Sequence, residues 1–339
     1  MSSPHVLTPG SSVSAIMLTV LAALIPAIGA YYYFFGPAIL VSLALASVTA
    51  LLAEAAMLRL RSYPLKHFLT DGSALLTAWL LALSIPPLAP WWLIVVGTAF
   101  AIVVAKHLYG GLGNNLFNPA MVGFAVLMIS FPATMTQWPA PLLLSQHPVG
   151  FGEALQYTFS GALHGVKLDA VTMATPLDTL KTQLNLQHTV GEVKNMPIFG
   201  MFGGKGTEVI AAMVLLGGLF LWQRRIITWH TPVSFLVALA LVAAIFNGID
   251  PSRYASPMFH LFTGGAMLGA FFIATDYVTA PTTPSGKLIF GAGVGFLEYV
   301  IRVFGGYPDG IAFSILIMNA AVPLIDAYTQ PRVFGHKPG

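Results

Sequence analysis

The chain has 339 residues, of which 56% are hydrophobic and only 8% are charged, with a net charge of +3 and a mean hydropathy of +0.79. Water-soluble proteins carry about 25% charged residues, so the composition predicts an integral membrane protein, and the small net charge gives no support for nucleic-acid binding. The lack of cysteine excludes disulfides, thiolate zinc sites, cysteine nucleophiles and cysteine-ligated iron–sulfur clusters.

Apolar segments long enough to cross a bilayer recur along the whole chain. A membrane-spanning helix needs about 20 mostly apolar residues. The candidate spans are 15–36, 37–58, 72–86, 91–109, 118–138, 208–223, 232–247, 257–276, 287–304 and 311–328. No basic residue precedes the first span, so we expect it to be retained rather than cleaved as a signal peptide. The sequence therefore predicts an all-α membrane protein with about ten transmembrane helices.

The distribution of Lys and Arg predicts the orientation of these spans, because short cytoplasmic loops are enriched in both residues. With the amino terminus in the cytoplasm, nine cations fall on the inner side and two near short outer connections. The inner set is Arg59, Arg61, Lys66, Lys106, Arg224, Arg225, Lys287, Arg332 and Lys337, and the outer set is Arg253 and Arg302. Both termini are then cytoplasmic, and the long hydrophilic segment 139–207 lies on the outer side.

The two halves of the sequence resemble each other. The pair Gly110-Gly111 is matched by a second glycine pair 195 residues later, and the segment 70–72 is matched by 263–265 at a separation of 193. Two nearly equal separations indicate a duplicated unit of five spans. Because five is an odd number, the two copies must cross the membrane in opposite directions, as an inverted repeat.

This duplication predicts three parts: a first five-helix repeat at 1–138, an outer loop at 139–207 and a second five-helix repeat at 208–339. In inverted-repeat folds, binding sites lie between the repeats, next to short or Gly/Pro-interrupted helices. The short segment 72–86, which runs into two prolines, and its counterpart 257–276 are the candidate broken helices.

The outer loop holds the most distinctive short motif, Asp169-Ala-Val-Thr172-Met-Ala-Thr175-Pro176. A threonine hydroxyl in an exposed loop can be esterified by a phosphate. The small Ala174 before Thr175 leaves room for a modifying enzyme, and Pro176 restrains the chain just after it. The alternative is an ordinary Ser/Thr turn in which Asp169 forms a local cap.

The ordered set of motifs along the chain resembles one family. The segments that carry the resemblance are Gly110–Gly123, Phe271–Asp276, Gly305–Gly310 and Met318–Asp326. Together they are similar to the RnfD component of the Rnf-type ion-translocating electron-transfer complex. This NqrB/RnfD family also includes the NqrB component of the sodium-pumping NADH:quinone reductase. The resemblance covers essentially the whole chain.

The resemblance implies a cofactor and residues that hold it. In that family FMN is joined through its phosphate to the last threonine of an S/T-x-A-T motif outside the membrane, which corresponds to Thr175, with Thr172 opening the motif and Asp169 beside it. Related subunits often have glycine where this chain has Met173, which leaves the loop conformation open. The resemblance also makes riboflavin a second candidate cofactor. The glycine-rich segments 110–118 and 305–310 are candidates for helix breaks at the repeat interface or for a second flavin or ion route.

The resemblance also implies partners and a location. It predicts a bacterial inner-membrane protein with a periplasmic loop, assembled with the other subunits of the complex, designated A, B, C, E and G, and modified by a flavin transferase. The complex couples electron transfer between ferredoxin and NAD to movement of Na⁺ or H⁺, so this chain alone is not expected to be a complete enzyme. The competing hypothesis is a secondary transporter or channel without a redox role, which inverted repeats and broken helices support equally.

Charged residues within the predicted spans are a further class of candidates, because such residues are costly in a bilayer. Glu298 and Arg302 stand four apart in the favourable order for a helical ion pair. Glu54 has Arg59 and Arg61 nearby in the sequence. Lys106 lies near an inner boundary, where a long side chain can reach the interface. A role of Glu54, Glu298 or Arg302 in ion transfer is an alternative that the sequence does not decide.

Overall fold

The computed structural model describes residues 12–163 and 165–330. Helices form almost all of its regular structure. The one sheet named within the described residues is a short ribbon in which β1 (Trp138–Pro139) pairs with β2 (Thr172–Met173) in antiparallel register, with Trp138 opposite Met173. The predicted all-α membrane fold is confirmed. Arg332 and Lys337, which entered the orientation argument, lie outside the described residues.

Among the described residues, four helices are long and apolar enough to cross a membrane. They are α1 (Val13–Phe35), α2 (Ala38–Leu60), α12 (His230–Ile249) and α16 (Ile311–Thr329). Shorter apolar helices complete the bundle: α4 (Ser73–Ser84), α5 (Trp91–Phe100) with its π-helical extension η1 (Ala101–His107), α6 (Pro119–Ser130) and α11 (Thr207–Gln223). The amphipathic α15 (Pro284–Phe304) packs against α12 and α16.

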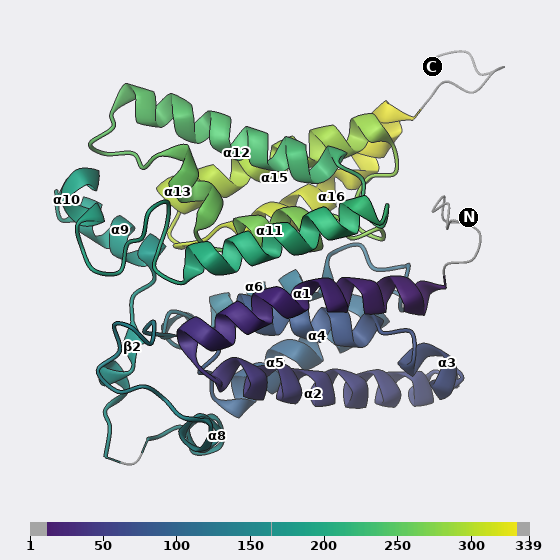
Figure 1. The fold of residues 1–339 in the computed structure, drawn as a ribbon. Coiled ribbons are helices and arrows are strands. Elements are labelled where there is room, and N and C mark those ends of the chain that lie inside the picture. The colour runs from purple at the N-terminus through teal and green to yellow at the C-terminus, as the bar shows by residue number, and fades with distance from the viewer. Residues whose placement is uncertain (1–11, 164, 331–339) are drawn as a thin grey trace.

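The order of elements repeats along the chain, as Figure 1 shows in purple to blue for the first set and green to yellow for the second. The first set is α1, α2, α3 (Leu65–Leu69), α4, α5 with η1, and α6. The second set is α11, α12, α13 (Pro257–Phe262), α14 (Ala266–Leu268) with η3 (Gly269–Ile273), α15, and α16. Each element of the second set begins about 193 residues after its counterpart. The two sets lie side by side, with α1 packed against α11 and α6 against α16.

Corresponding helices run in opposite directions. Helix α5 starts at the end of the bundle that carries the loop, because Leu88, just before it, packs with the loop residues Tyr157 and Val171. Helix α15 starts at the other end, where Thr283 hydrogen-bonds Thr329 at the end of α16. It ends at the loop, where Lys181 contacts the carbonyl oxygen of Arg302. The opposite directions are those of an inverted repeat.

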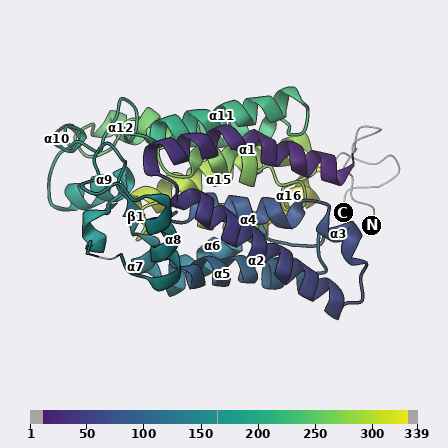
Figure 2. The same cartoon turned by 60° about the horizontal axis from the view of Figure 1, so that its bottom comes forward.

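The segment between the two sets forms a cap at one end of the bundle (Figures 1 and 2). It contains α7 (Pro132–Met135), β1, α8 (Phe151–Ser160), the 3₁₀ turn η2 (Leu168–Ala170), β2, α9 (Pro176–Asn185) and α10 (Val190–Lys194). The start of α1, the end of α16 and the short α3 lie at the opposite end, as Figure 2 shows. The loop and the described ends of the chain are thus on opposite sides of the bundle.

One of the two candidate broken helices is interrupted within its span, whereas the other, 72–86, contains the continuous α4 and has its break just before it. The predicted span 257–276 consists of α13, α14 and η3, interrupted at Gly264, whose φ of +62° is a left-handed conformation that favours glycine. The corresponding break before α4 lies at Gly72, with a φ of +82°. The predicted span 118–138 is wrong in length, because α6 ends at Ser130 and Pro132 begins the short α7.

Candidate functional site

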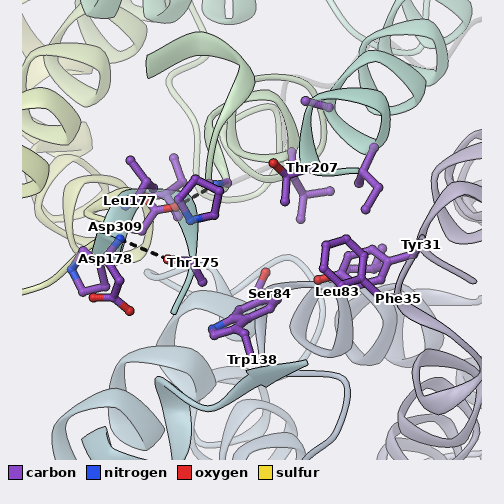
Figure 3. Close-up of a pocket in the computed structure, with 18 of the residues that line it drawn as sticks. Tyr31, Phe35, Leu83, Ser84, Trp138, Thr175, Leu177, Asp178, Thr207 and Asp309 are labelled. Atoms are coloured by element: carbon purple, nitrogen blue, oxygen red, sulfur yellow. Dashed lines mark hydrogen bonds between the residues drawn. The ribbon is translucent and has the colours of Figure 1, made fainter. Parts of the chain in front are cut away.

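A cavity of about 170 Å³ opens between the two helix sets, beneath the loop (Figure 3). Helices α1, α4 and α6 contribute one wall, α11 and the α14–η3 segment contribute the other, and loop residues close the end. Most of the lining is apolar. Its aromatic and methionine side chains are Tyr31, Phe35, Phe124, Trp138, Met121, Met128, Met135, Met173 and Met267. The charged residues that border it are Asp178, Lys205 and Asp309.

Thr175 borders this cavity at the start of α9. Its backbone is extended, and its Oγ1 accepts a hydrogen bond from the backbone N–H of Asp178 at 3.2 Å, so that it is the N-cap residue of the helix. Pro176 occupies the first helical position, where its fixed φ favours the helix and its missing N–H costs nothing. The Thr-Pro pair of the motif therefore places the hydroxyl of Thr175 at a helix N-terminus beside an apolar cavity.

The other two predicted site residues do not reach the cavity. The hydroxyl of Thr172 donates to the carbonyl oxygen of Leu168 at 3.0 Å, a local contact within the turn. Asp169 is exposed in η2 and is absent from the cavity lining. The structure instead brings Met173 and Ala174 to the cavity together with Thr175. The second half of the motif, from Met173 to Thr175, borders the cavity, whereas Thr172 in the first half stabilises the preceding turn.

Two glycine positions hold the Thr175 segment in place. A Cβ atom on Gly204 would lie 2.1 Å from the Cγ of Pro176, so the turn before α11 touches the proline ring directly. A Cβ atom on Gly264 would lie 2.7 Å from the Cδ1 of Leu177 and 2.1 Å from Oδ2 of Asp309. The loop helix thus packs against the broken helix of the second set. Neither contact has a signal in the sequence, because the partners are far apart along the chain.

Lys181 fixes α9 to the end of α15. Its Nζ donates to the carbonyl oxygens of Arg302 at 3.1 Å, Gly305 at 2.5 Å and Tyr307 at 2.9 Å. Carbonyl groups at a helix C-terminus lack partners within the helix, and a lysine ammonium can supply them. Burial lowers the pKa of Lys181, and the nearby Asp178 carboxylate offsets this in part. Sequence analysis missed this contact.

The second helix set contains a buried ionic cluster at its break. Arg302 Nη2 lies 2.5 Å from Oε1 of Glu298 and 3.2 Å from Oδ1 of Asp309, and its Nη1 donates to the carbonyl oxygen of His260 at 2.7 Å. The predicted pair between Glu298 and Arg302 is present. Asp309 is a third member that sequence analysis missed, because the connection between α15 and α16 folds back over the helix end.

The first helix set contains a comparable cluster near the opposite end. Lys106 Nζ lies 2.9 Å from both carboxylate oxygens of Glu54 and donates to Ser73 Oγ at 2.9 Å, and His107 Nε2 lies 3.1 Å from Glu54 Oε2. The sequence placed Arg59 and Arg61 near Glu54 but gave it no partner. Glu54 pairs with Lys106 rather than with the arginines that follow it. Lys106 is 2% exposed instead of reaching the interface, because the carboxylate and the start of α4 supply its partners.

Comparison with known proteins identifies the family. A model of the NQR2, RnfD, RnfE family matches residues 1–335. The chain belongs to this family. Three of its relatives are each named as the D component of an ion-translocating oxidoreductase complex. The protein of Yersinia pseudotuberculosis is 55% identical over 97% of this chain and 96% of its own length. That of Aliivibrio salmonicida is 52% identical over 100% and 98%, and that of Escherichia coli is 51% identical over 96% and 95%.

Two motifs that carry the resemblance to the NQR2, RnfD, RnfE family meet across the two helix sets. The backbone N–H of Asn118 donates to Oδ1 of Asn319 at 3.1 Å, and Nδ2 of Asn319 donates to the carbonyl oxygen of Thr279 at 3.1 Å. Asn118 is also the N-cap of α6, because its side chain accepts from the N–H of Met121. In this family member, the paired asparagines therefore join the start of α6 to α16.

Proposed function

We propose that this chain is the flavin-bearing membrane subunit of an Rnf-type ion-translocating oxidoreductase complex, with FMN esterified through its phosphate to Thr175. The position of Thr175 at the edge of the cavity between the two helix sets carries the proposal. The names of the relatives support the assignment to such a complex. The proposal gives the cavity an occupant and Thr175 a chemical role.

The surroundings of Thr175 suit a phosphodiester. Helix N-termini favour anions, because their first N–H groups are unpaired and the helix dipole is positive there. Lys205 borders the same cavity and is exposed, so that its ammonium adds positive charge nearby. Asp178 is the unfavourable neighbour. Burial raises the pKa of its carboxyl group, and Lys181 offsets part of this shift.

The remainder of the cavity suits a flat aromatic ring. Ligand pockets that hold cofactors are mostly apolar, with a few polar groups that fix orientation. Tyr31, Phe35 and Trp138 line the cavity together with methionines, whose flexible side chains adapt to the shape of a ligand. When bound, the flavin would supply the redox chemistry, and these residues would hold and orient it. The tether would keep the flavin at the site irrespective of its concentration outside.

The proposed role is that of one electron carrier within a larger assembly. Electron transfer between ferredoxin and NAD, and movement of Na⁺ or H⁺, are assigned to the complex with its other subunits, designated A, B, C, E and G, rather than to this chain alone. We place the chain in a bacterial inner membrane with both termini cytoplasmic and the loop periplasmic, where the flavin transferase would act on it. Riboflavin is retained as a second candidate cofactor without an assigned site.

A direct test is the mass of the peptide that contains Thr175. The full chain is expressed with a flavin transferase, and a denaturing gel is inspected for flavin fluorescence before digestion. We expect a fluorescent band and a peptide heavier by FMN less one water. Thr175→Val should abolish both, whereas Thr207→Val, at another threonine of the same cavity, should retain them. An unmodified wild-type peptide contradicts the attachment.

The runner-up function is a secondary transporter without a redox role. The opposed directions of corresponding helices, the breaks at Gly72 and Gly264 and a cavity between the sets are features that such transporters share. A transporter predicts no covalently attached flavin. The same gel and mass measurement therefore separate the two functions.

A further inference from the structure

Two carboxyl groups meet one guanidinium in the buried cluster at the end of α15. Glu298 is 0% exposed and Arg302 is 3% exposed, while the Asp309 side chain is 19% exposed and borders the cavity. Both carboxyl groups contact the same nitrogen, because Nη2 of Arg302 lies 2.5 Å from Oε1 of Glu298 and 3.2 Å from Oδ1 of Asp309. Two ionised carboxylates on one guanidinium would leave a buried negative charge uncompensated, whereas a proton on one of them removes it.

The donors around the two carboxyl groups show which of them is ionised. Asp309 accepts from the backbone N–H of Gly265 at 2.6 Å, from that of Ile311 at 3.3 Å and from Arg302. Three donors stabilise a carboxylate. Glu298 receives the Arg302 guanidinium on Oε1, but no N–H or O–H group of the described residues donates to its Oε2. The proton therefore belongs on Glu298.

The other titratable groups near the cluster do not supply a second positive charge. His260 is 2% exposed, and neither of its ring nitrogens has a hydrogen-bond partner among the described residues. A buried imidazolium without an acceptor, next to Arg302, is unfavourable, so His260 is neutral. The ammonium group of Lys181 donates to three carbonyl oxygens at the end of α15. Lys194 is exposed on α10 and acts on His260 only from a distance.

The cluster in the first helix set shows the contrast. Glu54 is a single carboxylate, and Lys106 places its ammonium 2.9 Å from both of the carboxylate oxygens. One acid and one base balance each other there, and no proton has to be shared. The second set has two acids for one base, and burial of the uncompensated charge would be costly.

We propose that Glu298 and Asp309 share one proton, carried on Glu298, and that the pair exchanges this proton with the cavity through Asp309. Two buried carboxyl groups held against one cation do not both ionise, as in acid pairs that share a single proton. Gly264 makes the arrangement possible, because a side chain at this position would displace Asp309 Oδ2. The inference goes beyond the proposed function, since the pair is built from the chain's own residues. Where the proposed function also holds, this proton lies at the wall of the flavin cavity.

The infrared spectrum of the full chain tests the shared proton. A protonated carboxyl group has a C=O stretching band that a carboxylate lacks. We expect Glu298→Gln to remove one such band near neutral pH while preserving the fold, because the glutamine amide can donate to Asp309 and accept from Arg302. Asp309→Asn should remove the same band, since Glu298 then faces Arg302 alone and ionises. Glu153→Gln, at a half-exposed loop carboxylate, should change nothing.

Two measurements on the unsubstituted chain complete the test. Transfer into D₂O should shift the band, because the proton exchanges through the cavity, and replacing choline by Na⁺ at constant pH should leave it unchanged. A band that Glu298→Gln and Asp309→Asn both leave in place, one that does not shift in D₂O, or one that Na⁺ abolishes would overturn the proposal. The band should persist in Thr175→Val, so loss of the flavin and loss of the proton site are separate outcomes.

Discussion

Lys181 of the loop helix α9 donates from Nζ to the carbonyl oxygen of Gly305 at 2.5 Å, at the end of α15. This contact joins the segment that carries Thr175 to the helix that carries Glu298 and Arg302. Movement of α9 away from the bundle would break it and leave helix-end carbonyl groups without a donor. The position of Thr175 therefore depends on the second helix set as well as on its own loop.

Replacing Lys181 by methionine should loosen the loop. The carbonyl oxygens of Arg302, Gly305 and Tyr307 lose a donor. Leaving buried polar groups unsatisfied costs about 1 to 3 kcal/mol, and partial solvent access places this site toward the lower end. We expect a lower thermal unfolding temperature and faster proteolysis within 139–207. Lys167→Met, at an exposed lysine of the same loop, is the control. Equal behaviour of the two variants would show that the Lys181 hydrogen bonds do not stabilise the loop.

Replacing Gly204 by alanine should displace Thr175. The added methyl would lie 2.1 Å from Cγ of Pro176, and the rigid proline ring cannot move without its helix. Overpacking of this kind costs about 1 to 3 kcal/mol. We expect less flavin attached per chain, measured as the fraction of modified peptide. Gly191→Ala adds the same methyl to the same loop at a position where no atom of the described residues lies within 4 Å of it, and should be modified normally. Equal modification of both variants would exclude a positioning role for Gly204.

Hydropathy and local motifs predicted much of the fold and one residue of the site. Apolar runs located most of the helices, the pairing of the two halves pointed to a broken helix at 257–276, and the motif that ends at Thr175 lies at the edge of the cavity. The remaining cavity residues had no such signal. Tyr31, Lys205 and Asp309 come from three segments widely separated in the sequence and meet only because the two helix sets pack together. Their positions in the sequence follow no regular spacing, so the sequence alone does not indicate that they form one site.

The ion pairs show the same limit. Glu298 and Arg302 are one helical turn apart, so sequence spacing predicts their contact. Glu54 has Arg59 and Arg61 close by in the sequence, yet its partner Lys106 lies 52 residues away. A buried carboxylate requires a close, well-oriented cation, and the packing of η1 against α2 provides one. Local spacing identifies a contact only where the helix itself supplies both groups.

The Glu54–Lys106 pair should show strong coupling in a double-mutant cycle. Removing either partner leaves a buried charge uncompensated, which costs about 3 to 5 kcal/mol, whereas replacing both by apolar residues is often nearly neutral. We expect Glu54→Leu and Lys106→Met each to lower the thermal unfolding temperature of the purified protein markedly. The double variant should be more stable than either single one. Additive losses would mean that the two charges stabilise the fold independently.

Protection of helix α8 should depend on pH through Glu153. The backbone N–H of Gly150 donates to Glu153 Oε2 at 2.9 Å, and His147 Nε2 lies 2.7 Å from Oε1. The Gly150 N–H, followed by His147, lowers the pKa of this carboxyl group below its ordinary value of 4.5. A lowered carboxyl pKa contributes stability that is fully present above the ordinary value and is lost as the pH falls through the lowered one.

Hydrogen exchange of the amides of 151–160, corrected for intrinsic rates, should therefore show constant protection above pH 4.5 and a decline below it. Glu153→Gln should have less protection at neutral pH and no decline attributable to this group, because its amide does not ionise. Glu192→Gln is a matched control, since Glu192 forms a similar capping contact with Thr189 at the start of α10 and does not touch α8. A decline in α8 protection that persists unchanged in Glu153→Gln would assign the pH dependence to another group.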